Sequence, residues 1–415
     1  MIKDILIAQK QELDTKFKEQ YVKREFNSDN LSNQMIKVII GPRRAGKSFF
    51  ALHFLNKLEK FGYVNFDDEQ LTEIKEYDSI VEAMNTVYNN PKYLLFDEIQ
   101  NLPKWELFAN RLQRQGYNIL ITGSNANLLS KELATHLTGR HLLINILPFS
   151  FKEYLQTLKK ELTSHQIKEK LGLYLINGGY PEPLIKNIGY KEYLSTLFDS
   201  IVYKDIVKRY NIRSPQGIEE LSYYLLSNSA SEYSYNNLSK MIKLHGINTI
   251  KRYISYLEES FIFFSVKRFS TKVKEQITSM KKIYSIDNGF IYAKAFKVSE
   301  SIGKLYENLV AQELKRKELN NLIKFFYWKN TQQEEVDFVI QEGIEVKQLI
   351  QVCYDIENIK TKKREINALL KASKELKCPN LLLITADYES EEQIEWFGFK
   401  GKVKFIPLWK WLLSQ

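Results

Sequence analysis

Short apolar runs, typical of strands, and an apolar stretch typical of a helix lie close together in the first part of the chain. Continuous runs of bulky apolar residues cover positions 38–40, 93–96 and 119–121. Such runs are typical of strands in a parallel sheet that is buried on both faces. The residues from Phe49 to Leu55 instead favour the start of a helix. This alternation of strand and helix patterns predicts an α/β domain with parallel strands.

The segment between the first run and this helix fits a phosphate-binding loop, because it matches G-x-x-x-x-G-K-[ST]. Its eight positions are Gly41, Pro42, Arg43, Arg44, Ala45, Gly46, Lys47 and Ser48. Backbone N–H groups of such a loop wrap the phosphates of a nucleoside triphosphate, and the helix N-terminus favours their charge. We expect Lys47 to reach the β- and γ-phosphates and the Ser48 hydroxyl to ligate Mg²⁺.

Two carboxylates, Asp97 and Glu98, follow the second apolar run. Sites of α/β proteins lie at the carboxyl ends of the strands, so these residues should emerge beside the phosphate loop. We expect Asp97 to hold the Mg²⁺ shell and Glu98 to polarise the attacking water as general base. The alternative is an ordinary acidic pair at a helix N-terminus.

Polar residues also follow the third run. We expect Ser124, with Asn125 as the second choice, to contact the γ-phosphate or the attacking water, although a simple turn is the alternative. Arg140 follows a predicted helix over residues 128–137. We expect it to act in trans as an arginine finger on a neighbouring subunit, the alternative being an ordinary charge at a helix C-terminus.

Several long motifs occur in the order found in a known group of proteins. They are GPRRAGKS at 41–48, YLLFDEIQNLPKWE at 93–106, TGSNANLLSKELATHLTGRHLLINILPFSFKEYL at 122–155 and NGGYPEPL at 177–184. The chain resembles prokaryotic AAA+-type P-loop ATPases of the AAA_14/DUF4143 type, which join a P-loop domain to a C-terminal domain of long-uncharacterised function. The resemblance runs almost to the C-terminus. It implies that the nucleotide is ATP and that the subunits form a homo-oligomeric ring, such as a hexamer.

Length and composition place the chain in a broad class. A chain of 415 residues exceeds one typical core, so two to four domains are expected. No run approaches the roughly 18 to 20 apolar residues that cross a bilayer, and the N-terminus has no apolar signal-peptide core. The two cysteines, Cys353 and Cys378, form no C-x-x-C pair that would indicate a zinc ribbon. We therefore expect a cytoplasmic protein with no membrane partner.

The positive charge is concentrated in the middle of the chain. Residues 201–295 contain 15 lysines and arginines against 8 acidic residues, within a total net charge of +10. The hydrophobic pattern there predicts helices over 235–244 and 249–260 and strands over 261–266 and 282–286, which is the order of a winged helix. The charge excess favours DNA or RNA as the partner.

Six basic residues of this segment are candidates for DNA contact. Lys251 and Arg252 lie off the apolar stripe of the second helix, where they would face the major groove or the flanking phosphates. The other four, Lys267, Arg268, Lys272 and Lys274, flank the predicted wing loop. A solvated lysine-rich surface and a winged helix that binds protein are the alternatives.

The last 120 residues place charged side chains on a predicted hairpin of strands over 335–340 and 343–347. This part resembles the PD-(D/E)xK nuclease fold, with Val336 in place of the proline. The resemblance implies that Glu307 is the helix acid, that Asp337 is the strand acid and that Glu345 and Lys347 form the E-x-K. Asp337 and Glu345 would then hold Mg²⁺, and Lys347 would steady the developing charge. The alternative is a structural domain whose Glu345 and Lys347 pair with each other.

We therefore expect four parts. They are a P-loop ATPase domain with an N-terminal helix over 1–165, a helical linker over 166–215, a winged helix over 216–295 and a restriction-endonuclease-like α/β domain over 296–415. Such a protein would hydrolyse ATP and act on DNA, including branched or forked forms, while nuclease activity stays open. Two alternatives are an ATP-dependent signalling or defence switch whose winged helix binds protein, and a DNA-remodelling motor with an inert nuclease fold.

Overall fold

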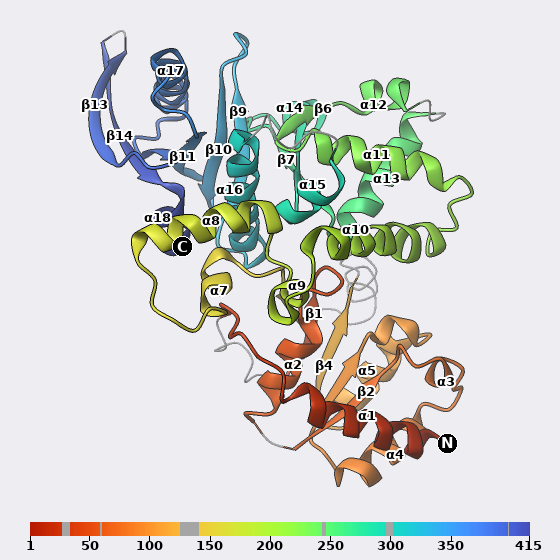
Figure 1. Ribbon diagram of the computed structural model, residues 1–415. Coiled ribbons are helices and arrows are strands. Elements are labelled where there is room, and N and C mark those ends of the chain that lie inside the picture. The colour runs from red at the N-terminus through yellow and green to blue at the C-terminus, as the bar shows by residue number, and fades with distance from the viewer. Residues whose placement is uncertain (27–33, 59, 125–140, 243–245, 296–301, 397) are drawn as a thin grey trace. The chain divides into compact units, whose positions relative to one another are not determined.

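The computed structural model describes residues 1–26, 34–58, 60–124, 141–242, 246–295, 302–396 and 398–415 (Figure 1). The chain divides into two compact units, which are considered one at a time. Unit 1 comprises residues 1–149 with 259–261, and unit 2 comprises residues 150–258 with 262–415. Both units mix helices with sheet, so the predicted α/β class is confirmed. Within the described ranges, no helix is long and apolar enough to cross a bilayer.

Unit 1 is built on a five-stranded parallel sheet typical of P-loop ATPases. Its strands are β1 (Ile36–Ile40), β2 (Phe61–Asn65), β3 (Tyr93–Asp97), β4 (Asn118–Gly123) and β5 (His141–Asn145). They lie in the order β2-β3-β4-β1-β5, and every neighbouring pair is parallel. All residues of β1 are buried, as the apolar run predicts. Because β4 lies between β1 and β3, the carboxyl ends of the three strands expected to carry the site are neighbours.

The helices of unit 1 pack on this sheet. They are α1 (Ile2–Lys16), α2 (Lys47–Leu55), α3 (Glu69–Thr72), α4 (Asp78–Tyr88), the 3₁₀ turn η2 (Ile99–Asn101) and α5 (Trp105–Arg114). α2 packs against β1, β3 and β4, and α1 packs against α4 and β2. The buried Gln9 amide donates to the Asn65 carbonyl at 3.1 Å and accepts from the Asn65 N–H at 3.0 Å, which fastens α1 to the end of β2.

Unit 2 begins with a series of helices. They are α7 (Phe151–Gln156), α8 (Ser164–Asn177), α9 (Pro181–Lys186), α10 (Tyr190–Ser200), the π-helix η3 (Ile201–Lys208) and α11 (Pro215–Ser227). The motif NGGYPEPL forms the connection from α8 to α9. Gly178 ends α8 with φ +72°, and the Gly179 N–H donates to the Asp287 carboxylate at 2.8 Å. Tyr180 is buried, with its ring centroid 5.1 Å from that of Phe290.

The basic middle of the chain folds around a small antiparallel sheet. Its elements are β6 (Ser231–Tyr233), α12 (Tyr235–Met241), α13 (Ile247–Glu259), β7 (Phe263–Lys267), α14 (Val273–Thr278), β8 (Lys281–Ser285) and α15 (Asn288–Lys294). The strands lie in the order β6-β8-β7. The predicted order of two helices followed by two strands is present, but the connection expected as a plain loop contains α14. The Ser270 hydroxyl helps to start this helix, because it accepts from the Lys272 N–H at 3.0 Å and donates to Glu275 at 2.9 Å.

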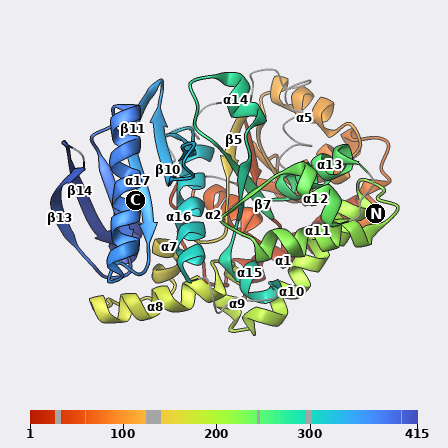
Figure 2. The same ribbon diagram turned by 90° about the horizontal axis from the view of Figure 1, so that it is seen from above.

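The last part of unit 2 carries a six-stranded mixed sheet. Its elements are α16 (Ile302–Leu319), β9 (Lys324–Lys329), β10 (Glu335–Glu342), β11 (Glu345–Cys353), α17 (Ile359–Leu376), β12 (Leu381–Thr385), β13 (Ser390–Trp396), β14 (Phe399–Pro407) and α18 (Leu408–Leu413). The order is β13-β14-β12-β11-β10-β9, with β9 to β11 antiparallel and β11, β12 and β14 parallel. α17 lies along the sheet and packs against β11, β10 and β14 (Figure 2). Both cysteines, Cys353 and Cys378, are free thiols buried in this core.

A buried polar network joins the small sheet to α16. The Asn308 amide donates to the Ser285 carbonyl at 3.0 Å and to the Asn288 side chain at 2.6 Å. Its oxygen accepts from the Ser229 hydroxyl at 2.8 Å and from the Ser285 N–H at 2.9 Å. The Gln312 amide donates to Ser285 and Asn288 as well. These bonds satisfy polar groups that would otherwise be buried without partners.

Candidate functional site

Backbone geometry fixes the phosphate loop between β1 and α2. A side chain at Gly41 would bring its Cβ within 1.9 Å of the Ile146 carbonyl oxygen, so only glycine fits there. Ile146 is itself tied to β1, because its N–H donates to the Ile40 carbonyl at 2.8 Å. Gly46 has φ +93° and directly precedes Lys47, the first residue of α2. The strand, loop and helix that the motif requires are all present.

Lys47 and Ser48 both form hydrogen bonds at the phosphate loop. The Lys47 ammonium is buried and donates to the Pro42 carbonyl at 3.0 Å, so it lies within its own loop. The Ser48 hydroxyl donates to Asp97 Oδ1 at 2.8 Å. The two residues expected to hold Mg²⁺ are 49 positions apart in the sequence and are brought into direct contact.

Asp97 is buried at the end of β3 and is held from three sides. Besides Ser48, the Tyr63 hydroxyl donates to Oδ2 at 3.1 Å and the Thr122 hydroxyl donates to Oδ1. Burial raises the pKa of the Asp97 carboxyl, and the neighbouring Glu98 charge raises it further, while the three hydrogen bonds oppose the shift. A cation beside this carboxylate would favour its ionised form, which suits a ligand of Mg²⁺.

Thr122 on β4 connects the two acidic residues. Its hydroxyl accepts from the Glu98 N–H at 3.1 Å while it donates to Asp97. Glu98 has a left-handed backbone with φ +51°, a conformation that is costly for a non-glycine residue and clusters at functional sites. Its carboxylate accepts from the Gln100 amide at 2.5 Å. The backbone and the side chain of Glu98 are therefore each held by a hydrogen bond.

Ser124, expected to contact the γ-phosphate or the water, is buried directly after β4. The hydrogen bonds to the acidic pair come from Thr122, two positions earlier. Thr122 could have been selected as the polar residue that directly follows the apolar run 119–121. The second choice, Asn125, and the expected arginine finger, Arg140, lie outside the described residues.

Asp67, which follows β2, is a further acidic residue near Glu98 that was not among the predicted site residues. Burial raises the pKa of Asp67, and the charge of Glu98 adds to this effect. The positive charges of Arg43 and Arg44 oppose it, so the loop arginines act on the same carboxylate. The Asn101 amide fixes Asp67 with a hydrogen bond of 2.9 Å. Asp67 lies two residues after β2, a strand that the sequence pattern did not indicate, so no predicted element pointed to it.

A second set of charged residues lies in unit 2. Glu307 on α16 and Glu335 and Asp337 on β10 converge on one ammonium, that of Lys282 on β8. The Lys282 nitrogen lies 2.8 Å from Glu307, 2.5 Å from Glu335 and 3.2 Å from Asp337. Burial by itself lowers the pKa of Lys282, but the carboxylates around it raise the pKa well above its ordinary value. The three carboxylates thus favour the charged form of Lys282.

The structure does not bring Glu345 and Lys347 to this set. Phe338 pairs with Ile350 and Glu342 pairs with Glu345, so Asp337 lies at the opposite end of the hairpin from the expected E-x-K. Glu345 and Lys347 form an ion pair with each other, with side chains 67% and 47% exposed. The expected four-residue arrangement was wrong because the hairpin register places Asp337 beside Gln351 and leaves Glu345 and Lys347 at the turn.

The β11 residues beside Asp337 are neutral. The Asp337 N–H donates to the Gln351 side chain at 3.1 Å, and its carboxylate accepts from the Val352 N–H at 3.0 Å. Gln351 in turn donates to Glu365 of α17 at 2.6 Å. In the part of the chain that the structure describes, no group of three or more His, Cys, Asp or Glu side chains is arranged to hold a metal ion. These residues do not fit the Mg²⁺ site that a nuclease resemblance implies.

Five of the six candidate DNA-contact residues lie on the surface. Those five are Lys251, Arg252, Lys267, Lys272 and Lys274. Lys251 lies over the Tyr235 ring at 5.5 Å, and Lys272 pairs with Glu275 at 3.1 Å. Arg268 is different, because it is half-buried and its guanidinium donates to the Lys329 carbonyl of β9.

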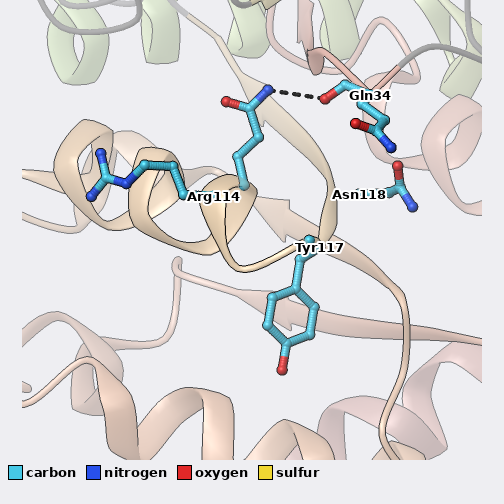
Figure 3. Close-up of a pocket in the computed structure, with 6 residues that line it drawn as sticks. Gln34, Arg114, Tyr117 and Asn118 are labelled. Atoms are coloured by element: carbon cyan, nitrogen blue, oxygen red, sulfur yellow. Dashed lines mark hydrogen bonds between the residues drawn. The ribbon is translucent and has the colours of Figure 1, made fainter.

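An open pocket of about 230 Å³ lies at the amino end of β4. It is lined by Gln34, Gln113, Arg114, Gly116, Tyr117 and Asn118, and the Gln113 amide donates to the Gln34 carbonyl at 2.9 Å (Figure 3). In a parallel sheet the phosphate loop and the acidic pair lie at the other ends of these strands. The pocket is therefore separate from the candidate nucleotide site.

Three segments of the chain match known family models. Residues 33–155 match an AAA domain, residues 168–301 match a domain of unknown function (DUF8612), and residues 302–411 match a second domain of unknown function (DUF4143). The expected P-loop ATPase domain is confirmed by the first of these matches.

Two curated relatives extend over most of the chain. "Uncharacterized protein MJ1544" of Methanocaldococcus jannaschii is 37% identical over 399 residues, which cover 91% of this chain and 88% of the relative. An uncharacterized protein of Haemophilus influenzae is 29% identical over 397 residues, which cover 91% and 94%. Among solved structures, a Walker-type ATPase of Pyrococcus abyssi has a TM-score of 0.42 at 14% identity, covering 66% of this chain and 98% of its own. The chain thus belongs to the same family as the Methanocaldococcus jannaschii protein, and its residues 33–155 form an AAA-type P-loop ATPase domain.

Proposed function

We propose that this protein hydrolyses ATP in unit 1 and uses the cycle to handle DNA through the middle of unit 2. The observation that carries the first part is the contact of the Ser48 hydroxyl with Asp97, 2.8 Å apart across two elements. The residues present fit Mg²⁺, since a hydroxyl and a carboxylate are typical oxygen ligands for it. When bound, Mg²⁺ would neutralise charge on the phosphates.

The protein residues have separate roles in this proposal. The loop N–H groups and the Lys47 ammonium bind the β- and γ-phosphates, and Lys47 exchanges its contact with the Pro42 carbonyl for a phosphate oxygen. Glu98 takes the proton of the attacking water. Thr122 keeps Asp97 and Glu98 in fixed positions relative to each other.

ATP turnover by purified protein tests this assignment. Lys47→Ala should abolish turnover, and Glu98→Gln should lower kcat by about 10²- to 10⁴-fold while ATP still binds, because only the general base is removed. Glu82→Gln, on the exposed face of α4, is a matched control that should leave the rate unchanged. If Glu98→Gln turned over ATP like the wild type, Glu98 would not be the base.

The proposal of a winged helix is supported by the connection order β6, α12, α13, β7, β8 and by the sheet order β6-β8-β7. α13 buries Ile250, Ile254 and Leu257, and it exposes Lys251 and Arg252 on its other side. Such a helix can enter a major groove, and its charges would bind phosphates. The excess of basic residues over 201–295 supports the same partner.

DNA binding and its effect on turnover test this second part. We expect ATP turnover to rise on at least one of single-stranded, duplex, forked or four-way DNA. The double variant Lys251→Ala/Arg252→Ala should weaken DNA binding and lower the slope of log affinity against log salt by about 2, because two phosphate contacts are lost. Flat rates across the panel, with no tighter binding than weak nonspecific affinity, would contradict the DNA proposal.

One observation favours a second candidate, a switch whose middle segment binds protein. On α14, Val273 and Ile277 are 70% and 66% exposed, and apolar exposure of this kind is more typical of protein contacts than of a DNA-binding wing. The same panel separates the two candidates. Turnover that ignores DNA, together with unchanged DNA binding in the Lys251→Ala/Arg252→Ala variant, would favour the switch.

The proposed homo-oligomeric ring makes Arg140 a contributor to the neighbour's site. Arg140→Ala protein and Lys47→Ala protein should each be inactive alone, because one lacks the finger and the other lacks phosphate binding. Mixing them should restore turnover, since Lys47→Ala subunits can supply Arg140 to intact phosphate loops. A mixture as inactive as its components would contradict action in trans.

We further propose that residues 302–411 have a nuclease-like fold. The order of elements supports this fold. One helix (α16), three antiparallel strands (β9, β10 and β11), a second helix (α17) and a parallel strand (β12) follow one another along the chain. The fold alone implies no cleavage, because function depends on the site that a fold carries.

A further inference from the structure

The acidic residues of unit 2 enclose a buried ammonium. Lys282 is only 2% exposed, and its nitrogen lies within 3.2 Å of oxygens from Glu307, Glu335 and Asp337. Three carboxylates this close together repel one another and need a compensating cation. The side chain of Lys282 supplies that cation from within the chain.

The surrounding contacts fix this arrangement. The Tyr284 hydroxyl donates to Glu307 Oε1 at 2.7 Å, and the Val352 N–H donates to the second oxygen of Asp337 at 3.0 Å. The carboxylates therefore have little freedom to turn toward another ion. A divalent cation in the same space would meet the ammonium at close range, where two like charges are strongly unfavourable.

The lysine comes from a different part of the chain than the carboxylates. Lys282 lies on β8 of the three-stranded sheet, within residues 168–301, whereas its three partners lie within residues 302–411. The contact thus crosses from one domain of unknown function to the other, beside the polar network around Asn308.

We propose that Lys282 is the permanent cation of this acidic cluster, in place of a divalent metal, and that the cluster locks the two domains together instead of cutting DNA. The comparison with a nuclease rests on the fold proposed above. The charge arrangement itself does not depend on that fold. It follows that the wild-type chain binds no divalent metal at Asp337.

Binding of Mn²⁺ without nucleotide or DNA tests the proposal by titration calorimetry. Wild type and Asp337→Asn should bind the same number of Mn²⁺ ions, and Lys282→Ala should gain one site that Lys282→Ala/Asp337→Asn loses. Lys281→Ala removes a charge from the adjacent residue, whose ammonium contacts the Tyr235 hydroxyl at 3.2 Å, and it should gain no site. Any Mn²⁺ binding at the phosphate loop is common to all variants.

Two outcomes would overturn the proposal: a wild-type Mn²⁺ site that Asp337→Asn removes, or a folded Lys282→Ala protein that gains no site. Folding is checked by circular dichroism. If Lys282→Ala does not fold, the comparison of wild type with Asp337→Asn still decides the question. Because neither ATP nor DNA is present, a failure of the proposed ATPase or DNA function would leave this result unaffected.

Discussion

Thr122 is the residue that links the two acidic residues of the nucleotide site. One hydroxyl donates to Asp97 and accepts from the backbone of Glu98, so a neutral side chain positions both acidic residues. The sequence pattern indicated the phosphate loop, Asp97 and Glu98, because a loop motif or a charged side chain is recognisable without knowledge of its neighbours in space. It did not indicate Thr122, because a threonine that ends an apolar run is also an ordinary strand residue.

A pair of substitutions at Thr122 checks this role. Thr122→Val keeps the shape of the side chain but removes the hydroxyl, so kcat for ATP should fall about 10- to 100-fold, as expected for the loss of hydrogen bonds worth about 1.5–3 kcal/mol. Thr122→Ser should retain most of the rate. Steady-state turnover with a parallel measurement of nucleotide affinity gives the comparison.

Ser124→Ala tests the serine that we expect at the γ-phosphate or the attacking water. Ser124 is buried directly after β4, and if its hydroxyl contacts either group, the variant should lose turnover as Thr122→Val does. A change of less than threefold would contradict a role for Ser124 in the reaction.

At the scale of elements, the register of one hairpin decided which prediction failed. The alternation of apolar and charged residues correctly indicated a hairpin of two strands, but Glu342 pairs with Glu345 and Phe338 pairs with Ile350. Because the pairing register follows from where the turn lies, Glu345 and Lys347 stay near the turn, and Asp337 lies beside Gln351. A two-residue motif is too short to show which end of a hairpin it occupies.

The parts that were predictable share a different property. The phosphate loop and the apolar runs of β1, β3 and β4 each lie within a few consecutive residues. Each of these patterns is typical of one kind of element, so the burial and parallel pairing of the strands followed from the sequence. Lys282 had no local signature, since it lies on β8 and finds its partners on α16 and β10. Contacts between elements distant in sequence require the tertiary structure.

The connection from α8 to α9 gives a prediction at this scale. Gly178 has φ +72°, and a Cβ there would come within 1.7 Å of Asp287 Oδ1, so Gly178→Ala should lower the free energy of unfolding by about 2–4 kcal/mol. Gly172→Ala, within α8 and with open space around it, is the control and should be neutral or stabilising by up to about 1 kcal/mol. Urea denaturation followed by circular dichroism measures both variants, and equal stability would contradict the steric argument.

At the scale of the whole molecule, the middle sheet and the C-terminal domain form one compact unit although they match separate family models. The Asn308 network and the Lys282 cluster both cross the boundary between those matches. Buried polar contacts of this kind are costly to separate, because each partner would be left without a hydrogen bond. We expect the two domains to unfold together.

Asn308→Leu tests this cooperation. The substitution removes the Asn308 contacts of Ser229, Ser285 and Asn288, although Gln312 still donates to Ser285 and Asn288, so the free energy of unfolding should fall by about 3 kcal/mol or more. Asn320→Leu, at the exposed end of the same helix, should change it by less than about 0.5 kcal/mol. Thermal unfolding should keep a single transition for the unit, and separate transitions for the middle and C-terminal parts would contradict a shared core.

The two buried thiols of the C-terminal core have a practical consequence. Burial raises the pKa of the Cys353 thiol to about 12. Roughly one molecule in 10⁴ would therefore carry the reactive thiolate at pH 8, even if an alkylating reagent could reach the sulfur. Alkylating reagents should therefore leave both native cysteines untouched until the core opens. The rate of that alkylation therefore measures how fast unit 2 opens. A single cysteine introduced on an exposed helix can be labelled with a fluorophore while the native thiols stay in place.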